Sequence, residues 1–349
     1  MTKTSNFNLD DFKPKYLDQD RWNNWYFVVH FTHEEKDYTL KLAVAEGTLP
    51  LAKKVMSFSR DPLSFTQEAD VRVLNSPIND INVVIDEEQE IEFKETKNEV
   101  IVEMGDLMAI CKPDEQRIIS KNEKLKADLT FTPRGPIFYW GEEKGATCIV
   151  TEATRTAGIE SLSNVKGMIS FEGKEIKIES RGIFERVWIN ELNLFEIRVM
   201  NWIYANFEQL YMYICHSESV TMDSTPFHFE TGKVYLMPEN DYLFTKKLEI
   251  TPENWVYLKE FRQFIPFEQK VEVKTDKGNL KLKVTPINYP QFFQAMRLEH
   301  LVIDNIPGWN SLFYDIPVKI QGKFVSKDKK TIELINGQGM NEVIRLGPL

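Results

Sequence analysis

Apolar and polar residues alternate with a period of two through most of the chain. In residues 36–47, polar side chains separate an apolar set made of Tyr38, Leu40, Leu42 and Val44. The same alternation recurs in residues 90–95, 124–131 and 174–180. It is typical of strands that are buried on one face. Residues 269–284 repeat it on both sides of an Asp-Lys-Gly sequence, which predicts a β-hairpin with its turn at 276–278.

Helical spacing is confined to two short stretches, residues 49–58 and 253–264, which we predict to be short helices. Many short strands at roughly even spacing, joined by polar turns, indicate an all-β protein of the sandwich or barrel class. A length of 349 residues favours two domains. Residues 155–175 are rich in small and polar side chains, so we predict tandem domains at 1–165 and 166–349.

Composition and charge narrow the range of partners. The net charge of −10 argues against nucleic acid as the main partner. The three cysteines are Cys111, Cys148 and Cys215. They are far apart and form no Cys-x-x-Cys pair, so we expect a reducing compartment. The first residues lack the apolar segment of a signal peptide, and no apolar run is long enough to span a bilayer. We therefore expect a cytoplasmic protein without an integral membrane segment.

The common motifs of cofactor and metal chemistry are absent from the sequence. It contains no phosphate-binding glycine loop, no Gly-x-Ser-x-Gly, no His-Glu-x-x-His and no EF-hand loop. His30 and His33 are neighbours in sequence, but a spacing of three puts them on opposite faces of a strand. We therefore expect neither a cofactor nor a metal site.

An excess of aromatic residues, 12% of the chain, is the strongest sign of a ligand. In residues 21–31, RWNNWYFVVHF, alternation puts Trp22, Tyr26 and His30 on one face and Trp25 and Phe27 on the other. The first face mixes polar and aromatic groups, as the wall of a ligand cavity does. The alternative is that His30 is a hydrogen-bonded residue of the core.

A second aromatic segment covers residues 195–216. Trp202 and Tyr204 share one face there, and Tyr211 and Tyr213 follow the next turn. These rings would either line a barrel interior or form an exposed face of amphipathic side chains. His228, in the sequence TPFHFETGK, is a weaker candidate for ligand binding.

Two short motifs add a resemblance to a known family. NNWYFVVHF, residues 23–31, resembles the Glu-Trp-Trp-Tyr-Phe-x-x-His signature of hydroxyneurosporene synthase (carotenoid hydratase) and AttH-like proteins. GIFERVW, residues 182–188, is similar to the segment that opens the second domain of that group. The group is lipocalin-like and includes cyclases of the Diels-Alderase type. The resemblance implies two lipocalin-like antiparallel β-barrel or sandwich domains in tandem.

The motifs match the family position by position only in part. In the first motif Trp25, Tyr26, Phe27 and His30 match, whereas Asn23 and Asn24 stand in place of the acid and the first tryptophan. In the second motif Gly182 and Trp188 match, and Glu185 stands where the family has an aspartate. The polar neighbours of that acid are replaced by Ile183, Phe184 and Val187.

The resemblance implies a role for Glu185 as a proton donor. A carboxylic acid in an apolar cavity keeps its proton more readily and can protonate an alkene, a carbonyl or a leaving hydroxyl. The faces of nearby rings would stabilise positive charge that develops on the substrate: Trp25, Tyr26, Trp188 and Trp202. The alternative for Glu185 is a structural ion pair with one of the arginines nearby in the sequence, which are Arg181, Arg186 and Arg198.

These observations lead to one hypothesis and two alternatives. We predict a cofactor-independent enzyme, a hydratase, dehydratase or cyclase, that acts on a small hydrophobic isoprenoid, polyene or polyketide-like substrate. Its predicted catalytic residues are Glu185 and His30. The first alternative is a carrier or sensor that binds such a molecule without turnover. The second is a structural β-sandwich module of a larger assembly.

Overall fold

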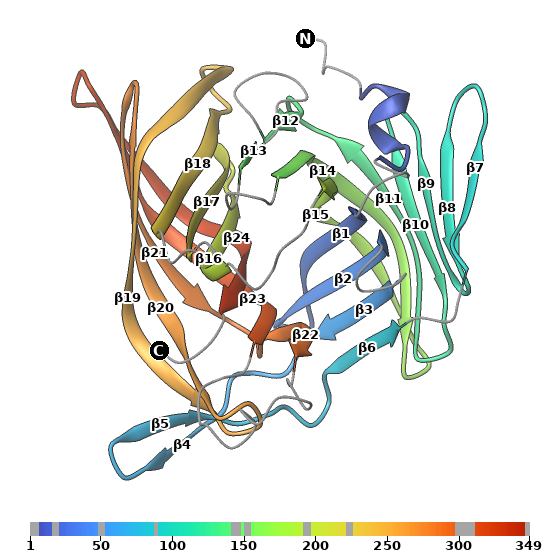
Figure 1. The fold of residues 1–349 in the computed structure, drawn as a ribbon, viewed down its shortest axis with the longest axis horizontal. Helices are drawn as coiled ribbons and strands as arrows, with labels where there is room; N and C mark the ends of the chain where they lie inside the picture. Colours follow the sequence, from blue (N-terminus) through green and yellow to red (C-terminus); the bar gives the residue numbers. More distant parts are fainter. Residues whose placement is uncertain are drawn as a thin grey trace. The chain divides into compact units, whose positions relative to one another are not determined.

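The computed structural model describes residues 7–15, 21–47, 53–86, 90–140, 148–149, 155–190, 197–220, 226–296 and 311–345. Most of these residues lie in β-strands (Figure 1), which confirms the all-β prediction. The chain divides into two compact units. The first comprises Met1–Ser59 and Ile81–Leu192, and the second comprises Arg60–Asp80 and Asn193–Leu349. Residues 155–175, where the sequence predicted a domain boundary, lie within the first unit.

The described part of the first unit forms one sheet of 13 antiparallel strands and a short 3-10 helix, η1 (Leu9–Phe12). Its strands are β1 (Arg21–His33), β2 (Lys36–Gly47), β3 (Lys53–Ser59), β6 (Ile81–Asp86), β7 (Glu92–Glu95), β8 (Val100–Met104), β9 (Leu107–Cys111), β10 (Gln116–Lys121), β11 (Leu125–Pro133), β12 (Phe138–Tyr139), β13 (Cys148–Ile149), β14 (Arg155–Phe171) and β15 (Lys174–Asn190). The order along the sheet is β6-β3-β2-β1-β15-β14-β11-β10-β9-β8-β7.

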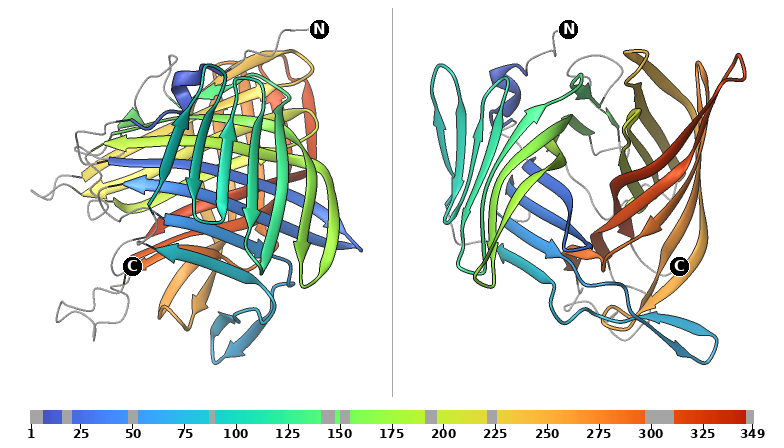
Figure 2. Two further views of the ribbon diagram at one scale, coloured as in Figure 1. Left: turned by 90° about the vertical axis from the view of Figure 1, so that its right-hand side faces the viewer. Right: turned by 180° about the vertical axis from the view of Figure 1, so that it is seen from behind.

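This sheet curls into a half-barrel around the core of the first unit. β2 approaches β8 and β9, although five strands separate β2 from β9 in the sheet order. The left view of Figure 2 shows one end of the sheet, with the teal and green strands β7 to β11 side by side. The enclosed face carries the core residues of the unit, among them Trp25 and Phe27 of β1 and Leu129 and Phe131 of β11. Phe12 of η1 packs its ring against that of Phe184.

The described part of the second unit contains 11 strands. They are β4 (Phe65–Glu68), β5 (Val71–Leu74), β16 (Ile197–Asn206), β17 (Leu210–Val220), β18 (Pro226–Leu236), β19 (Asp241–Leu258), β20 (Gln263–Thr275), β21 (Gly278–Pro286), β22 (Gln291–Met296), β23 (Ser311–Ser326) and β24 (Thr331–Arg345). Because β18 pairs with both β17 and β19, eight of them close a barrel in the order β18-β17-β16-β24-β23-β21-β20-β19. Because the barrel is closed, each of these eight strands has a paired neighbour on both sides.

The hairpin predicted at residues 269–284 is confirmed. Val273 lies opposite Leu280 and Val271 opposite Leu282, as the alternation required. The hydroxyl of Thr275 accepts hydrogen bonds from the backbone N–H groups of Lys277 and Gly278, at 3.2 and 3.0 Å, and so fixes the turn.

Both helix predictions are wrong. Residues 53–58 belong to β3, which pairs with β2 and β6, so that neighbouring strands satisfy its backbone and bury Met56 and Phe58. Residues 49–52 lie outside the described part of the chain. Residues 253–264 form the end of β19, a turn and the start of β20, with Trp255 opposite Pro266. In both stretches strand pairing overrides a weak helical spacing.

The helices of the described residues include none with the length and hydropathy of a membrane span.

Candidate functional site

Strand β1 sends its residues to two chemically different faces. Trp25 and Phe27 lie in the core of the first unit, as predicted. Tyr26 and His30 lie on the opposite face and are also buried, while Trp22, further along that face, is half-buried. The predicted division of the RWNNWYFVVHF segment between faces is therefore confirmed.

Glu185 and Tyr26 share a row of side chains that also contains a second acid. Glu185 of β15 lies directly opposite Tyr26 of β1 on one side and Glu160 of β14 on the other. Directly opposed residues of antiparallel strands have Cβ atoms about 4.5–5.5 Å apart. Glu160 is fully buried and Glu185 is 8% exposed. The register therefore puts two carboxyl groups and a phenol side by side at buried positions.

The next two rows of the same face contain a lysine and a histidine. Lys41 of β2 is fully buried, and its Nζ lies 5.7 Å from the centre of the Tyr26 ring. Nδ1 of His30 lies 3.0 Å from the hydroxyl of Thr39. Burial lowers the pKa of His30 to about 4, and the weaker effect of Asp37 acts in the opposite direction. His30 is therefore neutral near pH 7 and can act as a hydrogen-bonding group, but not as a cation, on this face.

Trp25 and Trp188 lie on the core face, where they surround Arg186. The Arg186 guanidinium lies 4.1 Å from the ring centre of Trp25 and 5.3 Å from that of Trp188. It donates hydrogen bonds to Asn23 Oδ1 at 2.6 Å and to the carbonyl oxygen of Lys13 at 2.8 Å. Burial lowers the pKa of Arg186 to about 9. Because Arg186 and Glu185 are successive residues of one strand, their side chains lie on opposite faces, and Arg186 is not the ion-pair partner that the sequence allowed for Glu185.

In the second unit the aromatic residues of β16 and β17 form one cluster. Tyr204 lies opposite Tyr213, and the Trp202 and Tyr213 rings stack with their centres 5.3 Å apart and an angle of 4°. The cluster, Trp202, Tyr204, Tyr211 and Tyr213, is buried. It does not line the barrel interior, since the intervening residues Ile203 and Met212 belong to the barrel core.

His228 is not part of this aromatic cluster. It lies near the start of β18 opposite Glu218, with its side chain 54% exposed. Alternation places it on the barrel side of the strand, together with Glu230 and Val234. Of the predicted site residues, the structure thus brings together Glu185, Tyr26 and His30 in the first unit and the four aromatic residues in the second.

Several charged residues on these two faces were not predicted. Glu160 and Lys41 join the face of Glu185. In the second unit Glu342 lies opposite Trp202 and next to Asp315, which is fully buried. The sequence gives one sign of them, a charged residue inside a stretch of apolar or small residues. Lys41 lies in LKLAV and Glu160 in GIESLS. Their proximity to Glu185 depends on strand register, which the sequence did not reveal.

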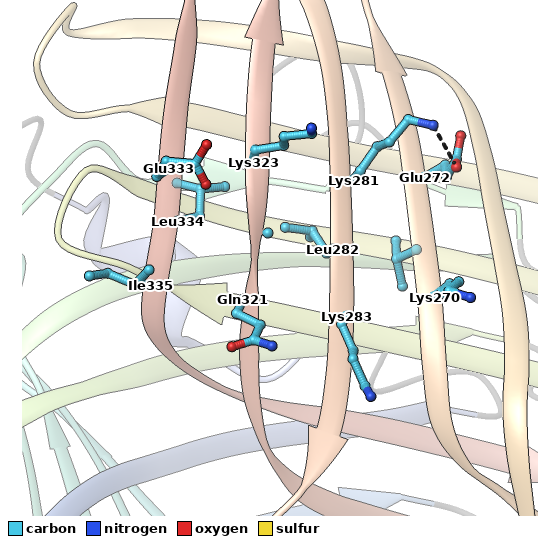
Figure 3. Close-up of a pocket in the computed structure, with 12 residues that line it drawn as sticks. Lys270, Glu272, Lys281, Leu282, Lys283, Gln321, Lys323, Glu333, Leu334 and Ile335 are labelled. Atoms are coloured by element: carbon cyan, nitrogen blue, oxygen red, sulfur yellow. Dashed lines mark hydrogen bonds and ion pairs between the residues drawn. The ribbon is translucent and has the colours of Figure 1, made fainter.

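A depression on the second unit has a different character. It has a volume of about 480 Å³ and lies over β20, β21, β23 and β24. Charged residues surround it in Figure 3: Lys270, Glu272, Lys281, Lys283, Lys323 and Glu333. Lys281 Nζ is 2.9 Å from Glu272 Oε1. Val271, Leu282, Leu334 and Ile335 also line it, so charged and apolar side chains both contribute to the depression.

Comparisons with known proteins give a shared fold at low sequence identity. No protein-family model matches the chain, and no curated protein matches it. An AttH-like protein from Nitrosomonas europaea has a TM-score of 0.65 and 13% identity, over 98% of this chain and 97% of that one. Kievitone hydratase from Nectria haematococca has a TM-score of 0.61 and 13% identity, over 99% and 96%. CghA, in a structure with Sch210972, has a TM-score of 0.64 and 11% identity, over 97% and 93%.

The chain has the fold of the AttH-like, lipocalin-like two-domain proteins. The resemblance inferred from residues 23–31 and 182–188 is confirmed at the level of the fold. Those two motifs also pair with each other: Tyr26 and Phe27 lie opposite Glu185 and Phe184 in the β1–β15 ladder.

Proposed function

We propose that the protein is a cofactor-independent enzyme that acts on a small, hydrophobic, unsaturated molecule of isoprenoid, polyene or polyketide-like type. Glu185 is its proton donor. The observation that supports this best is the buried row of Glu160, Glu185 and Tyr26. The names of two proteins with the same fold point in the same direction, since one is a hydratase and the other, CghA, has a small molecule in its structure.

Two adjacent buried acids favour retention of a proton. Burial disfavours a carboxylate, and a second carboxylate beside it adds repulsion, so protonation of one member of such a pair is favoured. The protonated carboxyl group of Glu185 gives its proton to a carbon–carbon double bond. The resulting cation is captured by water, which gives an alcohol, or by a second double bond, which gives a ring. The proton then released by the product restores the carboxyl group.

Aromatic and hydrogen-bonding groups serve the same reaction. The face of the Tyr26 ring beside Glu185 stabilises positive charge on the substrate. Neutral His30 offers a ring nitrogen for orienting a polar end of the substrate or for accepting a proton late in the reaction. Confinement of a flexible chain in one conformation lowers the entropic cost of cyclisation, so few catalytic groups are required.

A carrier without turnover is the second candidate, and one observation favours it. Ile183 and Val187, which flank Glu185 on its own face, are apolar where the related motif has polar residues. A carboxyl group with apolar neighbours along its strand has little help in directing water to a substrate. Such a face would still bind a hydrophobic molecule.

Turnover in deuterium oxide separates the two candidates. The full-length protein is incubated with a panel of isoprenoids and linear polyenes, and the products are followed by mass spectrometry for deuterium delivered to carbon. The matched variants are Glu185→Gln, Glu160→Gln and, as a control on the same strand, Glu179→Gln, whose side chain is 66% exposed. We expect Glu185→Gln to lose about 10²–10⁴-fold in turnover while it still binds the substrate, because a general acid contributes that much.

The outcomes assign one function or reject both. Deuterium incorporation that survives Glu185→Gln unchanged would refute Glu185 as the donor. Binding of a panel member by the wild-type protein without any product would identify a carrier. An equal loss in Glu179→Gln would show that the effect arises from stability, not from the acid.

A further inference from the structure

Four ionisable residues meet where β17 and β18 pair in the second unit. Glu218 lies opposite His228, and two positions along the ladder His216 lies opposite Glu230. Residues two apart on a strand share a face, so the four side chains form a square on one side of the ladder. The strand pairing therefore brings together two histidines that are twelve residues apart in the sequence.

The distances within this square are short. The His216 and His228 rings lie 4.8 Å apart, and His216 Nε2 is 3.6 Å from Glu218 Oε1. One ligand atom from each of His216, Glu218 and His228 can be chosen so that all three lie within 4.8 Å of one another. In a tetrahedral centre with metal–nitrogen bonds near 2.0–2.1 Å, ligand atoms are roughly 3.4 Å apart. Small side-chain rotations therefore bring these three atoms to the distances that a metal requires.

The fourth residue is arranged as a support for one of the ligands. Glu230 Oε1 lies 3.0 Å from Nε2 of His228, and the other carboxylate oxygen accepts a hydrogen bond of 3.0 Å from the backbone N–H of Leu248. With Nε2 engaged by Glu230, the nitrogen that His228 would offer to a metal is Nδ1. A carboxylate that holds the second nitrogen of a metal-binding imidazole fixes the orientation of its ring.

The donor set selects a class of ion. Two imidazoles and one carboxylate suit zinc and the neighbouring divalent transition metals, whereas calcium and magnesium prefer oxygen donors alone. Glu218 and His228 are 57% and 54% exposed, so an ion can enter and a water molecule can complete its coordination.

We propose that His216, Glu218 and His228 bind one divalent transition-metal ion, of which zinc is the representative, and that Glu230 positions His228. The sequence predicts no metal site, because His216 and His228 become neighbours only through the register of β17 and β18. The site is independent of the function proposed above, because Glu160, Glu185 and Tyr26 belong to the first unit and the residues of the metal site belong to the second. A bound ion would tie the two strands together near Glu218 and His228.

Metal titration of the full-length protein tests this proposal. The affinity tag is removed, the protein is dialysed against a chelator, and Zn²⁺ and Co²⁺ are added separately at a fixed neutral pH. Calorimetry gives the zinc stoichiometry, and the visible absorption of Co²⁺ reports tetrahedral nitrogen and oxygen ligands. The variants are His216→Ala, His228→Ala, Glu218→Gln and Glu230→Gln. His33→Ala is the control, because His33 is also near a glutamate, Glu34, with its side chain 40% exposed.

We expect one equivalent of zinc to bind to the wild-type protein and to His33→Ala. Loss of either ligand histidine should abolish this binding, and Glu230→Gln should weaken it by about 10–100-fold, as expected for a residue that orients a ligand. Weakening by Glu218→Gln should exceed that of Glu230→Gln. The proposal is overturned if the wild-type protein shows no saturable binding at one equivalent. It is also overturned if His216→Ala and His228→Ala bind as His33→Ala does.

Discussion

Replacement of His30 by glutamine should remove a specific part of the acid sensitivity of the protein. Burial lowers the pKa of His30 from 6.5 to about 4. The unfolded chain therefore binds a proton at this position more readily than the folded protein does. The stability associated with neutral His30 is fully present above pH 6.5 and is lost as the pH falls from 6.5 through 4. The two pKa values correspond to a total loss of about 3 kcal/mol, of which about 2 kcal/mol falls between pH 7 and pH 5.

Urea denaturation of the wild-type protein and of His30→Gln at pH 7 and pH 5 measures this difference. Hydrogen exchange of peptides from β1 and β2 establishes that the transition includes the first unit. Glutamine retains a polar group for the hydroxyl of Thr39, which lies 3.0 Å from the imidazole. We expect the variant to lose about 2 kcal/mol less than the wild type between the two pH values. The control, His33→Gln, changes an exposed residue and should follow the wild type. Equal losses in the wild type and His30→Gln would refute the argument from burial.

Two further predictions concern stability and are measured by the same denaturation assay. Asp106→Asn removes the ion-pair partner of buried Lys54 and should lower the free energy of unfolding by roughly 2–3 kcal/mol. Asp128→Asn removes a partner from an exposed pair and should lower it by less than about 1 kcal/mol. Equal losses in the two variants would contradict the role of burial. Gly167→Ala would place a Cβ atom 2.0 Å from a backbone oxygen, so we expect a loss of roughly 3 kcal/mol or more. Gly173→Ala also has a positive φ but meets no atom within 4 Å, and it should cost only about 1–2 kcal/mol. A smaller cost at Gly167 than at Gly173 would contradict the close approach.

The sequence predicted the fold class because alternation with a period of two is imposed by the strand itself. Every second residue of β11 is buried from Leu125 to Phe131, as the pattern required. The helix prediction that included residues 53–58 was wrong because β3 has apolar side chains on both faces, Val55 on one and Met56 on the other. Its sequence therefore lacks the alternation of a half-buried strand. The closure of the barrel depends on the pairing of β18 with β19, and pairing partners are not encoded in any local pattern.

The candidate site was predictable only as far as single strands allow. Alternation within β1 correctly separated Tyr26 and His30 from Trp25 and Phe27. It could not show that Glu160 lies beside Glu185, since that depends on the register between β14 and β15. The proximity of His216 and His228 depends in the same way on the register between β17 and β18. Local patterns identify the face of a residue, and register identifies its neighbours.

Two charged residues at successive positions of β15, Glu185 and Arg186, lie in different surroundings. Arg186 is accounted for by the core of the first unit: its guanidinium donates to Asn23 and to backbone carbonyl oxygens and lies against tryptophan rings. Glu185 lies on the other face, next to a second buried acid. A second carboxylate beside a buried one adds repulsion and desolvation, which favours a proton on one of the two. In the function proposed above, Glu160 is the group that keeps a proton on its neighbour, which is the property that acid catalysis requires.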